Sequence, residues 1–321
     1  SEASTSASQA LTSRNQAETF AQQASASASS VDASNIVHRT GNETIAGIKT
    51  FSSSPIVPVP TTNFQSVPLR STNITVNVGA GQAYTTINQA LEYLTGFYHM
   101  YKKSGVTATI NLKAGFVMAE QVLVSGIDLG WITIVGEDAE TIITHTSLTT
   151  AFNGSNYPAF GVDKGGTSPV IGQLFRFDVE KVGGSKHGLM TFGAGSSADV
   201  LPGKGFIGAG YIGIYTMNGS TVNADGANCS NAGGFGIYAV FASTINANGA
   251  DCSNAGNVGI ISISGSIVNA QGAIIQNQIT GNSRMRVQWG SIIVANGVDT
   301  SGGTITEFSQ AVNTLTSNGI I

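Results

Sequence analysis

The sequence is poor in charge, proline and cysteine. Only 10% of its 321 residues are Asp, Glu, Lys or Arg, and the formal net charge of −4 argues against nucleic acid as a partner. No apolar run approaches the ~20 residues that a membrane-spanning helix needs, so we expect no membrane insertion. The four histidines lack metal-ligand spacing, and neither a metal site nor a cofactor is predicted.

The chain is instead rich in glycine, with 41 residues, and part of it repeats. Between residues 211 and 281 one pattern occurs three times, and Gly213, Gly236 and Gly259 mark it at intervals of 23 residues. A weaker fourth copy follows after a two-residue insertion. A fixed period of this length indicates stacked structural units. The copies contain no leucine and much glycine, which disfavours leucine-rich and helical repeats.

Within each copy, apolar and polar residues alternate, which is typical of short β-strands. Glycine and asparagine divide each copy into pieces that are too short for helices. The sequence therefore predicts an all-β protein, a parallel β-helix (β-solenoid) with coils of about 23 residues. The expected inward-facing columns are Ile212, Phe235 and Val258; Ile214, Ile237 and Ile260; Val222, Ile245 and Val268; and Ala227, Ala250 and Ala273.

Two further positions of the repeat carry asparagine and cysteine. Asn231, Asn254 and Asn277 are expected to form a ladder at a turn, each amide bonding to the next. Cys229 and Cys252 share one position, which is open to a disulfide, a metal pair or two stacked thiols. Neighbouring parallel strands would hold their Cβ atoms ~4.8 Å apart, more than the ~3.8 Å that a disulfide favours. We therefore predict two buried free thiols.

Residues 1–31 are rich in alanine and serine, and small apolar residues recur there at alternating intervals of four and three. This heptad pattern predicts a coiled-coil stalk, and a flexible Ala/Ser spacer is the alternative. Alanine buries little area, so such a stalk is weakly stabilised. The seam comprises Ala3, Ala7, Ala10, Ala17, Ala21, Ala24, Ala28 and Val31, with Arg14 as its interruption.

Residues 32–72 form a connector segment with turn glycines and several prolines. Its stretch VHRTGNETIAGIKTFSSSPIVP, from Val37 to Pro58, resembles a short shaft segment that recurs in bacteriophage tail fibres before a distal domain. Such segments are trimeric in that family. The resemblance therefore implies a homotrimer, joined to other phage tail or baseplate proteins through its N-terminus.

The globular part is expected at residues 73–305, with a C-terminal closure or trimer contact at 306–321. It begins with a strand and then a helix, whose start shows a capping-box pattern at Thr86 and Gln89. This helix would cover the open end of the solenoid, and its tyrosines could alternatively form a sugar platform. Its apolar face comprises Ile87, Ala90, Leu91, Leu94, Phe97, Tyr98 and Tyr101.

The first coils are predicted around Ile110 and Ile132, which lie 22 residues apart. The succession NITVNVGAGQAYTTINQAL, INLKAG and ITIVGE resembles pectate-lyase-like right-handed β-helices and the tailspikes built on that fold, over roughly residues 74–300. The resemblance implies a right-handed coil. It does not imply one chemistry, because this fold carries lyases, hydrolases, esterases and plain binding proteins.

The candidate catalytic residues are Asp178 and Glu180. In the stretch LFRFDVEKV, strand alternation would place the phenylalanines and Val179 inward and the charged residues on one outward face. The two carboxylates could then lie ~5–9 Å apart, a range that includes retaining and inverting glycosidases. Arg176 would keep Asp178 ionised, which leaves Glu180 as the acid. A solvated, charged strand face is the alternative.

Candidate substrate-binding residues lie on both sides of the carboxylates. A predicted loop at 156–164 supplies Tyr157 and Phe160 as rings for sugar faces, Asp163 as a hydroxyl acceptor, and Lys164. Packing of this loop on the protein is the alternative. Basic residues near the carboxylates would bind an acidic sugar or merely offset negative charge. They are Arg176, Lys181, Lys186 and His187.

The outward column Tyr215, Tyr238 and Ile261 is expected to contact a neighbouring subunit, and a sugar-facing strip is the alternative. Stalk, shaft resemblance and β-helix together predict a receptor-binding protein of a phage tail fibre or tailspike. It would belong to the virion and bind polysaccharide, such as capsule or O-antigen, at the outer surface of the host bacterium. One alternative is a depolymerase, a glycoside hydrolase or lyase, acting on the same receptor. Another is a secreted polysaccharide enzyme or adhesin.

Overall fold

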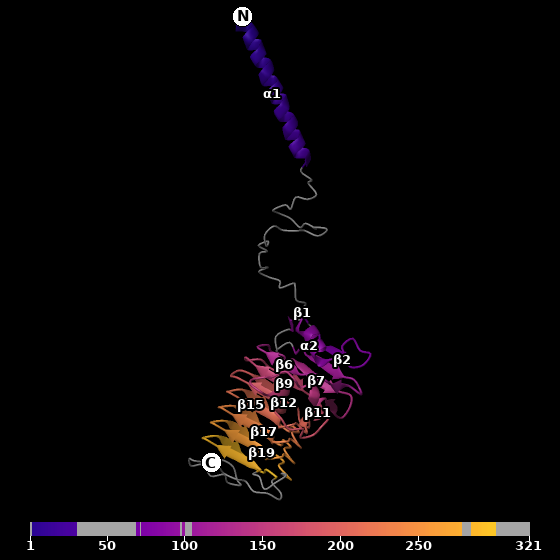
Figure 1. Ribbon diagram of the computed structural model, residues 1–321, viewed down its shortest axis with the longest axis vertical. Helices are drawn as coiled ribbons and strands as arrows, with labels where there is room; N and C mark the ends of the chain where they lie inside the picture. The colour runs from indigo at the N-terminus through magenta and orange to yellow at the C-terminus, as the bar shows by residue number, and fades with distance from the viewer. Residues whose placement is uncertain are drawn as a thin grey trace. The chain divides into compact units, whose positions relative to one another are not determined.

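The chain divides into two compact units, Ser1–Asn63 and Phe64–Ile321. The first contains α1 (Glu2–Ser30), so the Ala/Ser-rich segment is helical (Figure 1). The predicted shaft segment and C-terminal closure lie outside the described residues. The computed structural model describes residues 2–30, 69–70, 72–96, 98–99, 105–277 and 284–299.

Helix α1 is exposed along its described side chains, including Leu11 and Phe20. Its one described ion pair joins Arg14 Nε to Glu18 Oε1 at 3.2 Å, one turn apart. Helices in proteins gain most of their stability from packing an apolar face, and α1 packs none. Its assembly into a coiled coil therefore stays a prediction. Across the described ranges, no helix combines the length and apolar content of a membrane span.

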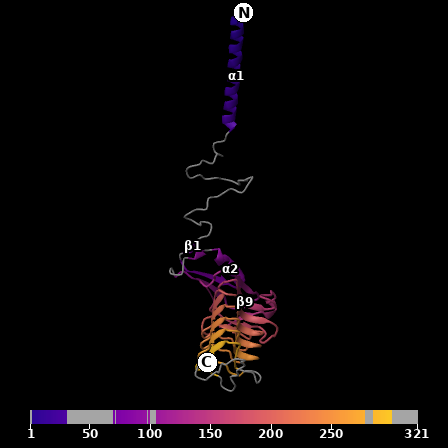
Figure 2. The same cartoon turned by 90° about the vertical axis from the view of Figure 1, so that its left-hand side faces the viewer.

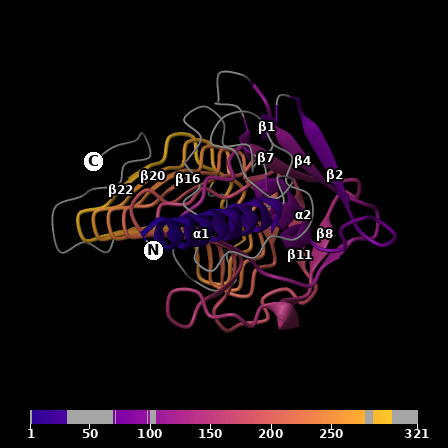
Figure 3. The ribbon, with the colours of Figure 1, turned by 90° about the horizontal axis from the view of Figure 1, so that it is seen from above.

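The second unit is a right-handed parallel β-helix of about seven turns, whose coils advance in chain order (Figures 1 and 2). Each turn visits three faces, and the first and second lie apart when the stack is seen from above (Figure 3). The first face consists of two sheets that isolated bridges join at Thr167–Ser197 and Ile171–Val200. One contains β2 (Ile74–Val78), β4 (Ala108–Leu112), β7 (Ile132–Gly136) and β10 (Val170–Ile171), and the other contains β13 (Ser197–Asp199), β16 (Thr221–Asn223), β18 (Thr244–Asn246), β20 (Ile267–Asn269) and β22 (Ile292–Val294).

The strands of the second face shorten along the stack to single bridges, whereas the third face keeps full strands from the early coils to the last described coil. The second face contains β5 (Val117–Met118), β8 (Thr141–Ile143), β11 (Leu174–Phe177) and β14 (Gly205–Ile207), then single bridges at Asn228, Asp251 and Ile274. The third face contains β6 (Val122–Ser125), β9 (Tyr157–Asp163), β12 (Lys186–Phe192), β15 (Ile212–Met217), β17 (Phe235–Val240), β19 (Val258–Ile263) and β21 (Met285–Gln288). A separate pair joins β1 (Leu69–Arg70) to β3 (Tyr98–His99).

The repeat of the sequence is the register of the later coils. The inward isoleucines of β15, β17 and β19 lie directly opposite one another, and hydrogen-bonded side chains on neighbouring coils are 23 residues apart. The first coils differ from the expectation, because Ile110 pairs with Ile134 rather than with Ile132. In the later coils, residues 23 apart in the sequence lie opposite each other. Between β4 and β7 the paired residues are 24 apart, two more than the spacing from Ile110 to Ile132.

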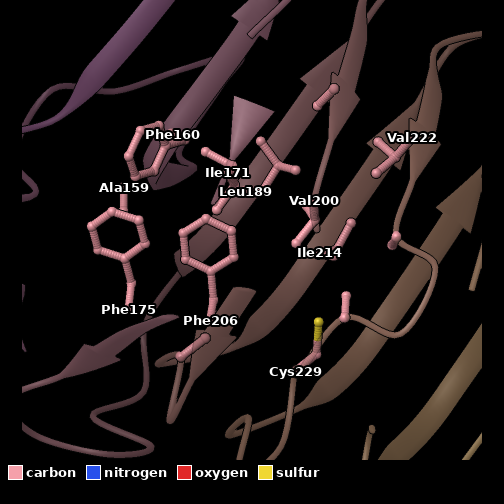
Figure 4. Close-up of a cluster of buried hydrophobic side chains, with 14 of the residues drawn as sticks. Ala159, Phe160, Ile171, Phe175, Leu189, Val200, Phe206, Ile214, Val222 and Cys229 are labelled. Carbon is pink, nitrogen blue, oxygen red and sulfur yellow. The ribbon is translucent and has the colours of Figure 1, made fainter. Parts of the chain in front are cut away.

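Aromatic rings fill the core of the middle coils (Figure 4). Phe160 and Phe175 lie with ring centroids 5.2 Å apart, and Phe175 stacks on Phe206 at 5.7 Å. Cys229 and Cys252 follow Phe206 in the next coils, as buried free thiols. Burial raises the pKa of both thiols. The prediction that these two cysteines form no disulfide is confirmed.

One predicted core column faces the other way. Ile212, Phe235 and Val258 are buried, but they pack with outward residues of the third face in a second apolar cluster. The glycine after each of them explains the reversal. A Cβ on Gly213 would lie 2.8 Å from the Cβ of Cys229, so Gly213 faces the core together with the next residue. The strand alternation is interrupted there, and Ile212 turns outward.

The asparagine ladder also lies elsewhere. Asn231, Asn254 and Asn277 adopt φ values of 60°, 58° and 54°, in the left-handed region that asparagine tolerates better than most residues. The amide contact between coils occurs on the first face, where Asn246 Nδ2 donates to Asn223 Oδ1 at 3.0 Å. The recurrent asparagines of the turn therefore reflect backbone geometry.

Helix α2 (Ile87–Thr95) lies at the N-terminal end of the β-helix, and its buried face confirms the predicted cap. Thr86 Oγ1 accepts from Gln89 N at 3.1 Å. Glu120, in the loop between β5 and β6, completes the cap, because its carboxylate accepts from the backbone N–H groups of Ile87 and Asn88 at 2.6 and 3.0 Å. The helix ends earlier than expected, and Phe97 and Tyr101 lie outside the described residues.

Candidate functional site

Two neighbouring connections between the second and third faces form the candidate site. They are residues 144–156, between β8 and β9, and residues 178–185, between β11 and β12, and we call them the paired loops. The next such connection spans only residues 208–211. Pink segments extend beyond the stacked orange coils in Figure 3, in the colour range that includes the paired loops. Backbone pairing continues between the loops where Tyr157 N donates to Ser185 O at 2.8 Å.

Asp178 joins the two loops at one end. It follows the last residue of β11, and its Oδ1 accepts from the backbone N–H of His145 at 2.9 Å and from that of Val179 at 2.9 Å. The same oxygen lies 2.7 Å from His145 Nδ1. Partial burial opposes ionisation of Asp178, but the hydrogen bonds from His145 outweigh it and hold the carboxyl pKa below its usual value.

The predicted geometry around the carboxylates is wrong in two respects. Strand β11 ends at Phe177, so Val179 is 47% exposed rather than inward. Arg176 Nε forms an ion pair with Glu140 Oε2 at 2.7 Å, whereas the partner of Asp178 is His145. Glu180 is exposed and lies against Gly208, where an added Cβ would be 2.6 Å from its Cγ. Asp178 and Glu180 thus belong to one loop and not to one strand face.

His187 lies at the other end of the loops and is only 1% exposed. Its Nε2 is 2.9 Å from Asn156 Oδ1, so a neutral ring donates there. Burial lowers the pKa of His187 to about 3. Its ring centroid is 6.0 Å from that of Tyr211 and 5.5 Å from that of Tyr215. His187 is therefore a fixed, uncharged donor at neutral pH rather than a proton acceptor.

Two lysines secure the loops. Lys186 Nζ lies 4.9 Å from the centre of the Tyr157 ring and donates to the carbonyl of Leu148 in the first loop. Its partial burial lowers the pKa of the ammonium group. Lys181 Nζ donates to Asn254 O at 2.9 Å, which connects the second loop to a coil of the repeat.

Three candidate residues lie away from the paired loops. The predicted loop at 156–164 is strand β9, with Tyr157 and Asp163 at opposite ends, roughly 20 Å apart. Phe160 is 1% exposed and belongs to the core, so it cannot present a ring to a sugar. Lys164 is exposed at the far end of this strand, beside the half-buried Asp163. The apolar residues of this stretch therefore belong to a buried strand and not to a binding loop.

Aromatic side chains continue from the paired loops along the outside of the third face. The Tyr211 and Phe235 ring centroids are 5.4 Å apart, those of Phe235 and Tyr238 are 5.2 Å apart, and Tyr215 stacks on Tyr238 at 5.0 Å. Burial raises the phenol pKa of Tyr215 and Tyr238. We call these four residues with His187 the aromatic ladder. It places the predicted outward column in contact with the site.

Sequence reasoning missed His145 as a member of the site, since its partner Asp178 lies 33 residues away. Asn156 falls in the predicted binding loop, but no sequence signal connects it to His187, 31 residues away. Tyr211 opens the repeat, and Tyr215 belongs to the column for which a sugar-facing strip is the alternative to a subunit contact. The signal for both tyrosines is the concentration of tyrosine and phenylalanine at the start of the repeat copies.

The described residues contain no group of three His, Cys, Asp or Glu side chains that could hold a metal ion. The paired loops offer instead one His–Asp pair, a lysine over a tyrosine ring, and neutral donors. These groups can bind hydroxyls and ring faces. No protein-family model matches the chain, and no curated protein matches its sequence.

Proposed function

We propose that this chain is the receptor-binding part of a phage tail fibre or tailspike, and that its β-helix binds a bacterial surface polysaccharide. The observation that carries the proposal is the accessible part of the aromatic ladder, which leads out of the paired loops along a rigid parallel face. Tyr211 is exposed and Tyr215 and Tyr238 are half-buried, whereas the buried Phe235 and His187 support them from beneath. Stacked aromatic rings bind the apolar C–H faces of sugars, and a polysaccharide needs such positions in a row.

The paired loops supply the polar part of this proposed site. The Asn156 amide and the Asp178 carboxylate are fixed by hydrogen bonds at opposite ends of the loops. Lys186 places a cation beside the Tyr157 ring. Groups that are held in this way bind hydroxyls or a sugar carboxylate with little loss of side-chain entropy. A rigid solenoid with longer loops on one side suits this use.

The trimer in this proposal rests on α1 and on the shaft resemblance. An exposed Ala/Ser-rich helix is marginal alone and is stabilised when its seam meets other copies. Sedimentation of the full chain should give three copies, and a monomer at micromolar concentration would contradict the trimer. This outcome is independent of polysaccharide binding.

Binding is tested with a panel of immobilised capsular and O-antigen polysaccharides. We expect Tyr211→Ala to weaken binding about tenfold, because it removes a ring that is 40% exposed and contacts both His187 and Phe235. Lys164→Ala is the matched control, since Lys164 is exposed at the far end of β9. Equal affinities of the Tyr211 variant and the wild type would refute the ladder as the site.

A depolymerase acting on the same receptor is the second candidate, and the His145–Asp178 pair favours it. A carboxylate at 2.7 Å from Nδ1 orients the ring, so that Nε2 can take or give a proton. Incubation with polysaccharide should then release reducing ends. His145→Gln should abolish the release while binding persists, and Glu180→Gln tests the second carboxylate. Intact polysaccharide after long incubation with the wild type would exclude this activity.

A further inference from the structure

The sharp turns between the third and first faces contain residues that their geometry disfavours. We call residues 192–196, 217–221, 240–244, 263–267 and 288–292 the turn edge. Four of its turns have positive φ at two successive residues, the pattern of a type I′ turn, in which Asn-Gly is preferred. The four pairs are Asn218–Gly219, Phe241–Ala242, Ser264–Gly265 and Trp289–Gly290.

Two bulky side chains occupy the position that asparagine takes in the first of these turns. Phe241 has φ 55° and Trp289 has φ 53°, and Ala242 follows with φ 58°. Left-handed backbone is strained for such residues. Core packing does not offset the strain, because Phe241 is 52% and Trp289 66% exposed. Strain at exposed aromatic residues indicates a role outside the fold.

The surrounding ladder holds these turns in place. Gly219 N donates to Phe241 O at 2.9 Å, and Gly265 N donates to Trp289 O at 3.1 Å, so parallel pairing continues through the turns. Below them, Ser266 is buried and its N–H donates to Ser291 Oγ at 3.1 Å. The backbone under both rings is therefore fixed by bonds to its neighbours.

The spacing and the charge of the turn edge define what it can bind. Phe241 and Trp289 occupy the same turn position two coils apart, which separates their backbones by ~9.6 Å along the stack. The turn edge contains no Asp, Glu, Lys, Arg or His, although its outer positions include Asn218, Thr244 and Ser264. Two rings on one line, with hydroxyls and an amide nearby and no charge, suit a neutral sugar chain.

We propose that the turn edge is a second glycan site, at which Phe241 and Trp289 stack on two sugar units of one uncharged polysaccharide chain. The inference rests on the proposed function, because it assigns a second contact line to the same receptor. It is separate from the aromatic ladder, which lies outside the third face beside the paired loops.

Trp289 reports directly on this site. The chain has two tryptophans, and Trp131 packs partly buried against the core, so Trp131→Phe leaves Trp289 as the single tryptophan, which excitation at the red edge of the tryptophan band selects over tyrosine. Acrylamide should quench this exposed residue strongly in the free protein. Saturation with the best-binding neutral polysaccharide of the panel should reduce the quenching constant about threefold, whereas hyaluronan, which is anionic, should leave it unchanged.

The replacement Phe241→Asn with Ala242→Gly and Trp289→Asn removes both rings and installs favoured turn residues. We expect affinity for the neutral polysaccharide to fall about tenfold without loss of thermal stability. Thr244→Ala, on the same edge, is the control that keeps both rings. Unchanged affinity of the ring-less variant, or no protection of Trp289, would overturn the proposal.

The remaining outcomes separate this inference from the proposed function. If Tyr211→Ala weakens binding and the ring-less variant does not, the receptor proposal stands and the turn edge fails. If the wild type binds no polysaccharide of the panel, both fail. If Trp289 is already protected without polysaccharide and becomes quenchable on dilution, the rings contact a second copy of the chain, which also overturns the glycan site.

Discussion

His145 and Asp178 lie 33 residues apart in the sequence, yet the ring Nδ1 of one is 2.7 Å from the carboxylate of the other. The backbone N–H of His145 reaches the same oxygen at 2.9 Å. This contact closes the paired loops at the end of the second face, and it connects two coils that share no sequence similarity there. The partner of Asp178 is therefore His145 and not Arg176, which strand alternation predicts.

Replacement of Asp178 should therefore cost stability in a pH-dependent way. The folded-state pKa of Asp178 is lowered, so its contribution is present above the unfolded value of ~3.9 and is lost as the pH falls through the folded value. We expect Asp178→Asn to cost about 1 kcal/mol at pH 7, because the group is partly exposed, and less at pH 2. Urea unfolding at both pH values measures this. An equal cost at both would show that charge is not involved; the exposed Glu180→Gln is the control and should change less than ~0.5 kcal/mol.

His187 should destabilise the fold in acid. Its pKa falls from the ordinary 6.5 to about 3 in the folded state, so the unfolded chain binds a proton first as the pH drops. Stability from this residue is complete above about pH 6.5 and declines toward pH 3, by on the order of 4 kcal/mol. His187→Gln should flatten this part of the unfolding profile while a donor to Asn156 is retained. The same acid loss in wild type and variant would contradict a buried, neutral His187.

Phe160 should behave as a core residue. Its ring contacts Phe175 and Phe206 and is 1% exposed, so Phe160→Ala should cost about 3–5 kcal/mol of unfolding free energy. Phe160→Leu keeps much of the volume and should cost clearly less. Polysaccharide affinity of the folded Leu variant should equal that of the wild type. A selective loss of affinity at unchanged stability would show that Phe160 contributes to binding.

The two cysteines should be unreactive until the coils open. Both thiols are buried and free, and burial raises their pKa, which removes the reactive thiolate. Ellman's reagent should label neither Cys229 nor Cys252 in the native protein and both in denaturant. Rapid labelling under native conditions would mean that this part of the core is accessible. Cys252→Ala provides a single-thiol control for the rate at Cys229.

Much of the solenoid was predictable because its interactions are local in pattern. Equal spacing of glycine and isoleucine gives equal register, and the register places the second-face cysteines one above the other without a disulfide. The helix cap at Thr86 was predictable for the same reason, since its donor is three residues away. The partner Glu120 was not, because it comes from the loop after β5.

The candidate site was predictable only in part. Tyr157, Asp178, Lys186 and His187 fall in or beside the paired loops, whereas Phe160 is in the core. Strand alternation failed where a strand ended, and no local signal in LFRFDVEKV marks its last paired residue. The left-handed turns are a similar case, since neither phenylalanine nor tryptophan indicates positive φ in a sequence.

The sequence by itself determined the β-helix, the register of the repeat coils and the free thiols, because stacking identical units repeats each short-range preference at a fixed interval. Only the tertiary structure decided which outward residues meet: His145 with Asp178, Asn156 with His187, and the rings of the aromatic ladder. Such contacts depend on loop lengths that differ from coil to coil. When a coil is longer or shorter than the 23-residue repeat, the positions of its outward side chains cannot be read from the spacing in the sequence.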